Sequence, residues 1–133
     1  MNGAPVMVFS LSKNGSYGLT ANFKVREFAC HDGTDTIFIS NQLVVVLQKI
    51  RDHFKKPVTI NSGYRTEVWS AKNSGAAYSQ HKYGMAADIT ISGITPAEIA
   101  TYAAQLMPNT GGIGVYKNFC HVDVRTDKSR WNG

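Results

Sequence analysis

The sequence has few cysteines and no long apolar run. Cys30 and Cys120 are its only cysteines, too few for a disulfide framework and without the CxxC spacing of a zinc ribbon or a redox motif, so we expect both to be structural. No stretch reaches the roughly 18 apolar residues of a transmembrane helix. Residues 1–10 also lack the basic start and apolar stretch of a secretory signal. We therefore expect no membrane span and no export signal in this chain.

Low-complexity tracts and internal repeats are absent as well. The chain has 133 residues, of which 43% are hydrophobic, and this is enough for one core but too little for two domains. We expect a single domain over residues 1–133, in which residues 1–20 are a candidate for a loosely attached N-terminal segment.

Positive charge exceeds negative charge. Fourteen Lys and Arg residues stand against nine Asp and Glu residues, which gives a formal net charge of +5 and a pI near 9.3. Such a balance favours polyanionic surroundings, either nucleic acid or an anionic cell wall. The basic residues are scattered over separate segments and form neither a groove-reading motif nor a basic arm. We therefore expect a solvated basic surface and no nucleic-acid partner.

Hydrophobic periodicity predicts three helices. Residues 40–54 carry apolar side chains three and four apart, with Ser40 available as the N-cap. Residues 95–98 (Thr-Pro-Ala-Glu) combine an N-cap hydroxyl, a proline at the first helical position and a capping-box glutamate, so a helix should start there and stop before Pro108. A weaker helical pattern covers residues 66–73, before the break at Ser74-Gly75.

Alternating β-branched residues predict strands at 57–62 and 88–92, and residues 112–117 and 119–125 suggest a tight antiparallel hairpin about Asn118. These strands and helices indicate an α+β fold with a small antiparallel sheet packed against helices.

Towards the N-terminus the pattern is more irregular. Residues 11–20, rich in Ser, Gly and Asn, are expected to form a loop or hairpin, and residues 31–35 a turn. Between them, Phe23, Val25 and Phe28 form an apolar set.

Two segments carry groups that bind metal. Residues 79–88 and 121–123 together offer two imidazoles and a carboxylate, the donors of a catalytic zinc site, in which three protein ligands leave a fourth position for water. Strand alternation puts His121, Asp123 and Arg125 on one face of their strand. His31 and His53 lack such a context, and we expect them to be ordinary histidines.

Three motifs occur in order along the chain: Ser62-Gly63-Tyr64-Arg65, then Ser79-x-His81-x-x-Gly84-x-Ala86-x-Asp88, then His121-x-Asp123. They resemble the zinc D-Ala-D-Ala metallopeptidases of the M15 group, and most of all its short, single-domain branch. That group includes D,D-carboxypeptidases, D,D-dipeptidases, phage L-alanyl-D-glutamate endopeptidases and murein endopeptidases. It shares its α+β zinc fold with the signalling domain of hedgehog proteins. The resemblance covers residues 22–125, nearly the whole chain.

The resemblance implies that zinc is held by His81, Asp88 and His121. It also implies that Arg65 faces the substrate carbonyl or the tetrahedral intermediate, a role that suits planar guanidinium donors. A structural pairing of Arg65 with a neighbouring acid is the alternative.

Tyr64 and Ser79 are candidates for lining the substrate cleft, because they stand next to Arg65 and close to His81. Sequence alone gives neither of them a specific role.

The general base is where this chain departs from better-known members of the group. Those members place an acid or a second histidine two or three residues before the last zinc ligand, where this chain has Asn118 and Phe119. Asp123 is the nearest acid, on the same strand face as His121. It is either the base or a carboxylate that orients a zinc histidine, and the sequence leaves both roles open.

The resemblance therefore implies a zinc-dependent hydrolase that cuts peptide bonds in the stem or cross-link of peptidoglycan. We expect a monomer that acts on the bacterial cell wall, made in the cytoplasm and released as phage endolysins are, or exported by other means. A non-catalytic zinc-binding module of the same fold is the alternative, supported by the missing upstream acid.

Overall fold

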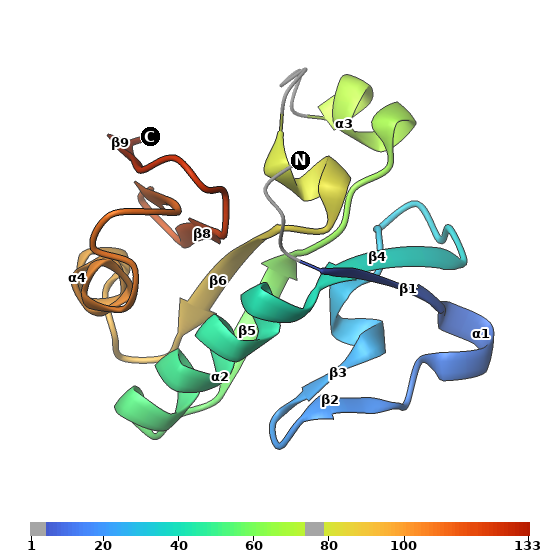
Figure 1. Ribbon diagram of the computed structural model, residues 1–133, viewed down its shortest axis with the longest axis horizontal. Coiled ribbons are helices and arrows are strands. Elements are labelled where there is room, and N and C mark those ends of the chain that lie inside the picture. Colours follow the sequence, from blue (N-terminus) through green and yellow to red (C-terminus); the bar gives the residue numbers. More distant parts are fainter. Residues whose placement is uncertain (1–4, 74–78) are drawn as a thin grey trace.

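The computed structural model describes residues 5–73 and 79–133 and has an α+β fold, as the sequence predicts (Figure 1). Its helical segments are α1 (Leu11–Asn14), α2 (Asn41–Phe54), α3 (Glu67–Asn73), α4 (Pro96–Leu106) and the 3-10 turns η1 (Val25–Phe28) and η2 (Gln80–Tyr83). Its strands are β1 (Val6–Ser10), β2 (Gly18–Thr20), β3 (Phe23–Lys24), β4 (Thr36–Ser40), β5 (Val58–Ser62), β6 (Ala86–Ile91), β7 (Gly112–Val115), β8 (Cys120–Asp123) and β9 (Ser129–Asn132).

A five-stranded sheet forms the centre of the molecule, in the order β5-β6-β8-β7-β9. All its neighbours are antiparallel except β7 and β9, which run parallel. Two further pairs, β1 with β4 and β2 with β3, form small separate antiparallel sheets. In Figure 1 α4 lies beside the central sheet, and α2 passes in front of β5 and β6.

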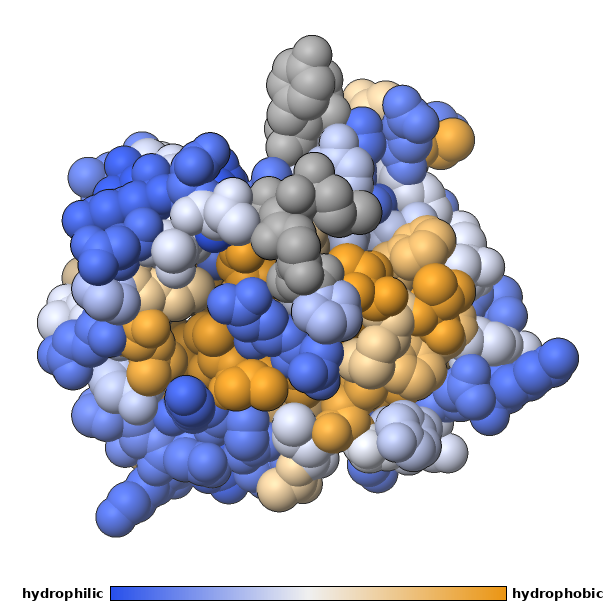
Figure 2. All heavy atoms as spheres, viewed as in Figure 1, coloured by the Kyte–Doolittle hydropathy of each residue, from blue (hydrophilic) through white to orange (hydrophobic). Residues whose placement is uncertain are grey.

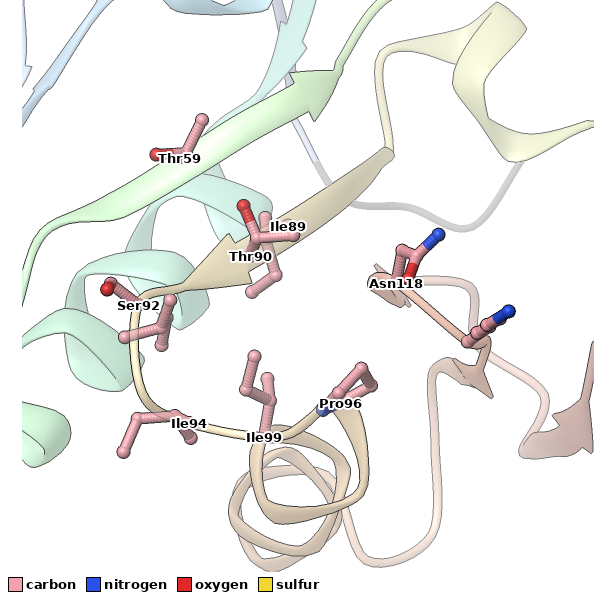
Figure 3. Close-up of a pocket in the computed structure, with 10 residues that line it drawn as sticks. Thr59, Ile89, Thr90, Ser92, Ile94, Pro96, Ile99 and Asn118 are labelled. Atoms are coloured by element: carbon pink, nitrogen blue, oxygen red, sulfur yellow. The ribbon is translucent and has the colours of Figure 1, made fainter.

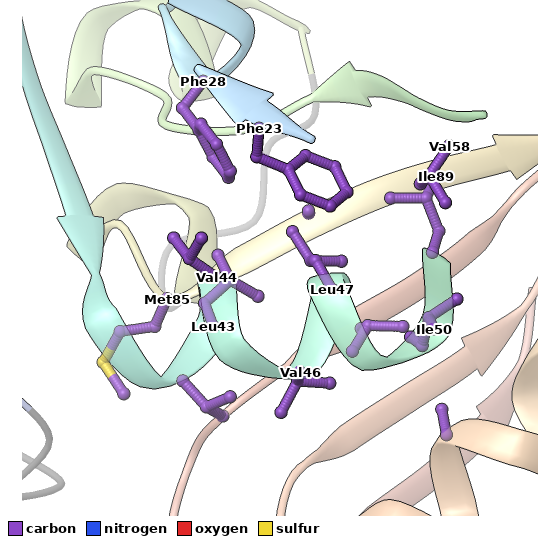
Figure 4. Close-up of a cluster of buried hydrophobic side chains, with 14 of the residues drawn as sticks. Phe23, Phe28, Leu43, Val44, Val46, Leu47, Ile50, Val58, Met85 and Ile89 are labelled. Atoms are coloured by element: carbon purple, nitrogen blue, oxygen red, sulfur yellow. The ribbon is translucent and has the colours of Figure 1, made fainter. Parts of the chain in front are cut away.

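Strand alternation divides the central sheet into an apolar and a polar face. Ile89 on β6 and Val122 on β8 are fully buried in one core with Leu47 of α2 and Ile99 of α4. Figure 4 shows α2 pointing its apolar side chains into this core, where they meet Phe23 and other residues of the N-terminal half. Because successive side chains of a strand point to opposite faces, the residues that flank Ile89 and Val122 face away from the core.

The apolar set of the N-terminal half is confirmed, because Phe23, Val25 and Phe28 are all buried. Both cysteines are buried and free, which agrees with a structural role. Burial, together with the charge of Asp88, raises the pKa of Cys120 to about 12.

The main predicted helices are confirmed. The hydroxyl of Ser40 accepts the backbone N–H of Leu43 (3.3 Å) at the start of α2. Thr95 and Glu98 form the predicted capping box at the start of α4, which ends before Pro108. The helix predicted over residues 66–73 is α3, and the break expected at Ser74-Gly75 lies outside the described residues.

The predicted strands are present with shifted ends. Strands β5 and β6 correspond to residues 57–62 and 88–92, although β6 begins earlier. The hairpin of β7 and β8 is antiparallel, but its ladder is shorter than predicted. Tyr116 donates its N–H to the carbonyl of Phe119 (3.0 Å), so the turn comprises Lys117 and Asn118. Strand β8 ends at Asp123, and the carboxylate of that residue accepts the N–H of Arg125 (3.1 Å).

The expectation of a loop or hairpin over residues 11–20 was wrong in part. Helix α1 lies there, capped by the hydroxyl of Ser10, which accepts the N–H of Lys13 (3.3 Å). Strand β2 then pairs with β3. Strands β1, β4 and β9 were not predicted, and the β1–β4 ladder ties residues 6–10 to residues 36–40.

Within residues 5–73 and 79–133, no helix combines the length and the apolar character needed to cross a membrane.

Removing the α4 cap should destabilise the fold measurably. Thr95→Ala deletes the hydroxyl that accepts the N–H of Glu98 (3.1 Å), and we expect the free energy of unfolding in urea to fall by about 1 kcal/mol. Thr101→Ala, at an exposed position inside the same helix, is the matched control and should cost nothing, because alanine is the better helix former. Equal losses at the two positions would contradict the capping role.

Candidate metal centre

Three polar side chains converge on the polar face of the central sheet: His81, Asp88 and His121. Asp88 on β6 and His121 on β8 are register partners, so their side chains lie side by side. The turn η2 brings His81 to the same place. Oδ1 of Asp88 lies 3.3 Å from Nε2 of His81 and 3.1 Å from Nδ1 of His121. All three residues are buried, and their candidate ligand atoms lie within 4.8 Å of one another.

The local sequence around His81 fixes its position. The hydroxyl of Ser79 accepts the backbone N–H of His81 (3.2 Å) and so caps η2. Gly84 ends the turn in the left-handed region at φ 72°, and its N–H donates a hydrogen bond to the carbonyl of His81 (3.3 Å). A side chain at Gly84 would collide with the backbone of Phe38. Glycine is therefore required here for both conformation and space, and the structure places Ser79 at a cap.

Each histidine is held by a second partner that selects one ring tautomer. Nδ1 of His81 lies 2.7 Å from the carbonyl of Gly63, which only accepts, so Nδ1 carries the proton and Nε2 is free towards Asp88. Nε2 of His121 lies 2.7 Å from Oδ2 of Asp123, which leaves Nδ1 facing Asp88. Metal-binding histidines are commonly fixed in this way, with the other nitrogen on a carbonyl or carboxylate.

The geometry fits a zinc ion. Zinc binds histidine nitrogen and carboxylate oxygen at about 2.0 to 2.2 Å in a tetrahedron, which sets neighbouring ligand atoms roughly 3.3 Å apart. The contacts of Asp88 Oδ1 with the two imidazoles, 3.1 and 3.3 Å, match this spacing. Two neutral imidazoles and one carboxylate also form a donor set that zinc accepts.

Asp123 is enclosed by donors. Its side chain has no exposed surface, and Oδ1 accepts the N–H of Gly112 (2.8 Å) and Nε of Arg125 (2.9 Å), while Oδ2 accepts Nη2 of Arg125 (2.6 Å) and faces His121. Burial raises the pKa of this carboxyl, but the hydrogen bonds of His121 and Arg125 outweigh it and hold the pKa well below the usual range. Of the two roles left open by the sequence, these contacts favour orientation of His121 over proton transfer from water.

Arg65 is paired with Asp88, a candidate metal ligand. Its Nη2 donates to Oδ2 of Asp88 (2.9 Å), and its Nε donates to the hydroxyl of Ser62 (2.9 Å). This is the structural pairing that we considered as the alternative to contact with substrate. The guanidinium occupies the Asp88 oxygen that faces away from the two histidines, and so directs Oδ1 towards them.

The groups of the centre shift one another's pKa values. Burial alone would raise the pKa of Asp88, but hydrogen bonds and charge from His121 and His81 hold it well below the usual range. For His121, burial lowers the pKa, yet the bonds to Asp123 and Asp88 outweigh it, so the pKa is raised. Two carboxylates therefore face the ring of His121, and a divalent cation at Nδ1 would take the place of a proton there.

The remaining candidates from the sequence lie around this centre. Tyr64 is half-buried, its ring packs edge-on against Phe38 (5.3 Å between centroids), and burial raises its pKa. His31 contacts the ring of Trp69, and His53 stacks on Tyr102. As expected, neither of these histidines belongs to the metal-binding group found among the described residues.

Sequence reasoning missed two residues of the site. Arg125 was placed on the right face, but its bidentate bond to Asp123 was not foreseen. Trp131 was not considered at all, yet its ring lies 5.0 Å from that of His121. Alternation along β8 was a signal for Arg125. For Trp131 no local signal exists, because its contact depends on the pairing of β9 with β7.

Surface cavities border two of the elements that carry the centre, β6 and η2. One of about 340 Å³ opens where β6 runs on beyond β8, and Figure 3 shows Thr90 and Asn118 on opposite sides of it. The other, of about 250 Å³, lies over β1, where apolar side chains gather in Figure 2. Val8 and Phe38 line it together with Tyr83 of η2.

Comparison with known families gives a match. The family model described as Peptidase M15 matches residues 20–123. No curated protein matches the chain. The matched segment contains His81, Asp88 and His121, and it ends at Asp123, so β9 lies beyond it.

Loss of either imidazole should abolish tight zinc binding. His81→Ala and His121→Ala each remove one of three donors, and we expect the zinc dissociation constant to rise by at least about 100-fold, measured by competition with a chromophoric chelator. The control is His31→Ala, an exposed histidine outside the cluster, which should bind zinc as the unaltered protein does. Unchanged affinity in both cluster variants would place the zinc elsewhere.

Proposed function

Because the chain belongs to the peptidase M15 family, we propose that it is a zinc-dependent metallopeptidase that hydrolyses peptide bonds in peptidoglycan. The observation that carries this proposal is the convergence of His81, Asp88 and His121 with a spacing that suits one tetrahedral ion. Membership in a peptidase family suggests a peptide substrate, and the donor set supports a zinc requirement.

In this proposal each residue of the cluster has a defined role. Nε2 of His81, Oδ1 of Asp88 and Nδ1 of His121 would hold the zinc. A zinc ion held there would supply a Lewis acid for the scissile carbonyl and for a water molecule. Arg65 keeps the Asp88 carboxylate turned towards the ion through its bond to Oδ2 (2.9 Å).

Asp123 acts in this proposal by holding His121. Its bond to Nε2 (2.7 Å) fixes the tautomer, and the guanidinium of Arg125 together with the N–H of Gly112 fixes Asp123 in turn. A carboxylate with no exposed surface and with donors on both oxygens is poorly placed to take a proton from water. We therefore assign it orientation and not base catalysis.

The substrate class rests on the resemblance and on charge. The M15 group acts on stem peptides and cross-links of peptidoglycan, whose D-residues ordinary proteases do not accept. A net charge of +5 suits approach to an anionic wall. We propose a D,D-carboxypeptidase or a stem-peptide or cross-link endopeptidase that acts as a monomer on the bacterial cell wall, as a phage-type endolysin does.

A non-catalytic zinc module is the second candidate. The observation that favours it is that the described residues offer no free base at the centre: Asn118 and Phe119 occupy the upstream positions, and Asp123 is fully engaged. Such a module would bind zinc through the same residues and would leave peptidoglycan intact.

Digestion of purified peptidoglycan separates the two candidates. We expect the zinc-loaded protein to release fragments whose masses, measured by mass spectrometry on defined muropeptides, identify the cleaved bond. A chelator should abolish release, and His81→Ala should release none, since both remove the ion. Zinc binding without any chelator-sensitive release would support the non-catalytic module.

Asp123→Asn tests the two roles of this residue. If Asp123 orients His121, the variant should bind zinc about 10- to 100-fold more weakly. Hydrolysis should then be low at limiting zinc and recover as the zinc concentration rises, in assays of rate against free zinc. If Asp123 is instead the base, the rate should stay low at saturating zinc.

A further inference from the structure

Trp131 reaches the metal centre across a glycine. Gly114 on β7 is the register partner of His121 on β8 and, in the other direction, of Trp131 on β9. Register partners point to the same face of a sheet, so the three residues form one row. Because Gly114 has no side chain, the indole spans the gap, and its ring lies 5.0 Å from the imidazole of His121 at an angle of 50°.

The same indole contacts the residue that holds Asp123. The guanidinium carbon of Arg125 lies 5.4 Å from the centre of the Trp131 ring, within the range of a cation–π contact. Arg125 in turn donates two side-chain hydrogen bonds to Asp123, which faces Nε2 of His121. Trp131 thus contacts both His121 and Arg125, and Arg125 holds the carboxylate that orients His121.

Trp131 is itself held in place. Its Nε1 donates to the hydroxyl of Tyr116 (2.8 Å), and the ring of Tyr116 stacks on Phe119 with centroids 4.4 Å apart. The neighbouring Arg130 binds β9 to the loop between α4 and β7, through its hydrogen bonds to the carbonyls of Gly111 (2.6 Å) and Met107 (2.5 Å). The indole therefore has a fixed plane against which the imidazole rests.

The indole of Trp131 packs directly over Gly114. A side chain there would come within 2.5 Å of the indole, so any larger residue would displace the ring from His121. The contact between β9 and the centre thus depends on a glycine at this one position.

We propose that Trp131 is a positioning residue of the metal centre. Its indole fixes the planes of His121 and Arg125, so that Nε2 of His121 keeps its hydrogen bond to Asp123 and Nδ1 of His121 stays directed at the ion. This inference rests on the proposed zinc site. It adds to that site a residue beyond the segment that the family model matches, which ends at Asp123. Without the indole, the imidazole and the guanidinium gain rotational freedom, and each bond of the chain weakens.

Zinc affinity and the visible spectrum of the cobalt-substituted protein test the proposal. We expect Trp131→Ala to bind zinc about 10-fold or more weakly and to alter the cobalt spectrum, while Trp131→Phe, which keeps an aromatic face, restores most of the affinity. Trp131→Leu, which keeps apolar cover without an aromatic face, provides a second test if the alanine variant does not fold. Thermal unfolding of the metal-free variants separates loss of the site from loss of the fold.

Tyr102→Ala is the matched control, because Tyr102 also stacks on a histidine, His53, that lies outside the cluster. It should leave zinc affinity unchanged. Unaltered affinity and cobalt spectrum in folded Trp131→Ala or Trp131→Leu would overturn the proposal. Failure of the unaltered protein to bind zinc would instead overturn the proposed function. A protein that binds zinc but cuts no peptide still gives a full test of Trp131.

Discussion

The register between β6 and β8 is the constraint on which the rest of the centre depends. It sets Asp88 opposite His121 on one face of the sheet and Ile89 opposite Cys120 on the other. A shift by one residue would turn Asp88 into the core and Ile89 towards the ion, so the core and the metal centre specify the same register. The hydrophobic core between the sheet and helices α2 and α4 thus helps to keep Asp88 and His121 in place, although no core residue is a candidate ligand.

Charge pairing explains how two carboxylates are kept in a largely buried site. Each is matched by an arginine: Asp88 by Arg65 at 2.9 Å and Asp123 by Arg125 at 2.6 Å. A buried carboxylate without such a partner would tend to take up a proton, which would remove it as a metal ligand or as an acceptor for a histidine. The hydrogen bonds of the histidines and the two ion pairs together keep both groups charged. One carboxylate holds Nε2 of His121, and the other nitrogen of that ring faces the candidate ion site.

Much of this architecture could be predicted from local patterns. Helices α2 and α4 follow from apolar spacing and from the caps at Ser40 and Thr95, and alternation along β8 placed His121 and Asp123 on one face. Strands β1, β4 and β9 were not predicted, because their pairing depends on partners far along the chain. The same reason hid Trp131. The role of Asp123 depends on the number of donors around it, and sequence does not reveal that number.

The central claim is that His81, Asp88 and His121 hold one zinc ion. Anomalous diffraction at the zinc absorption edge, from crystals of the zinc-loaded protein, tests it most directly. The account predicts one strong peak about 2.0 to 2.2 Å from Nε2 of His81, Oδ1 of Asp88 and Nδ1 of His121, with Asp123 still on Nε2 of His121. A peak bound through Nε2 of His121, or one without Asp88 as a ligand, would contradict it.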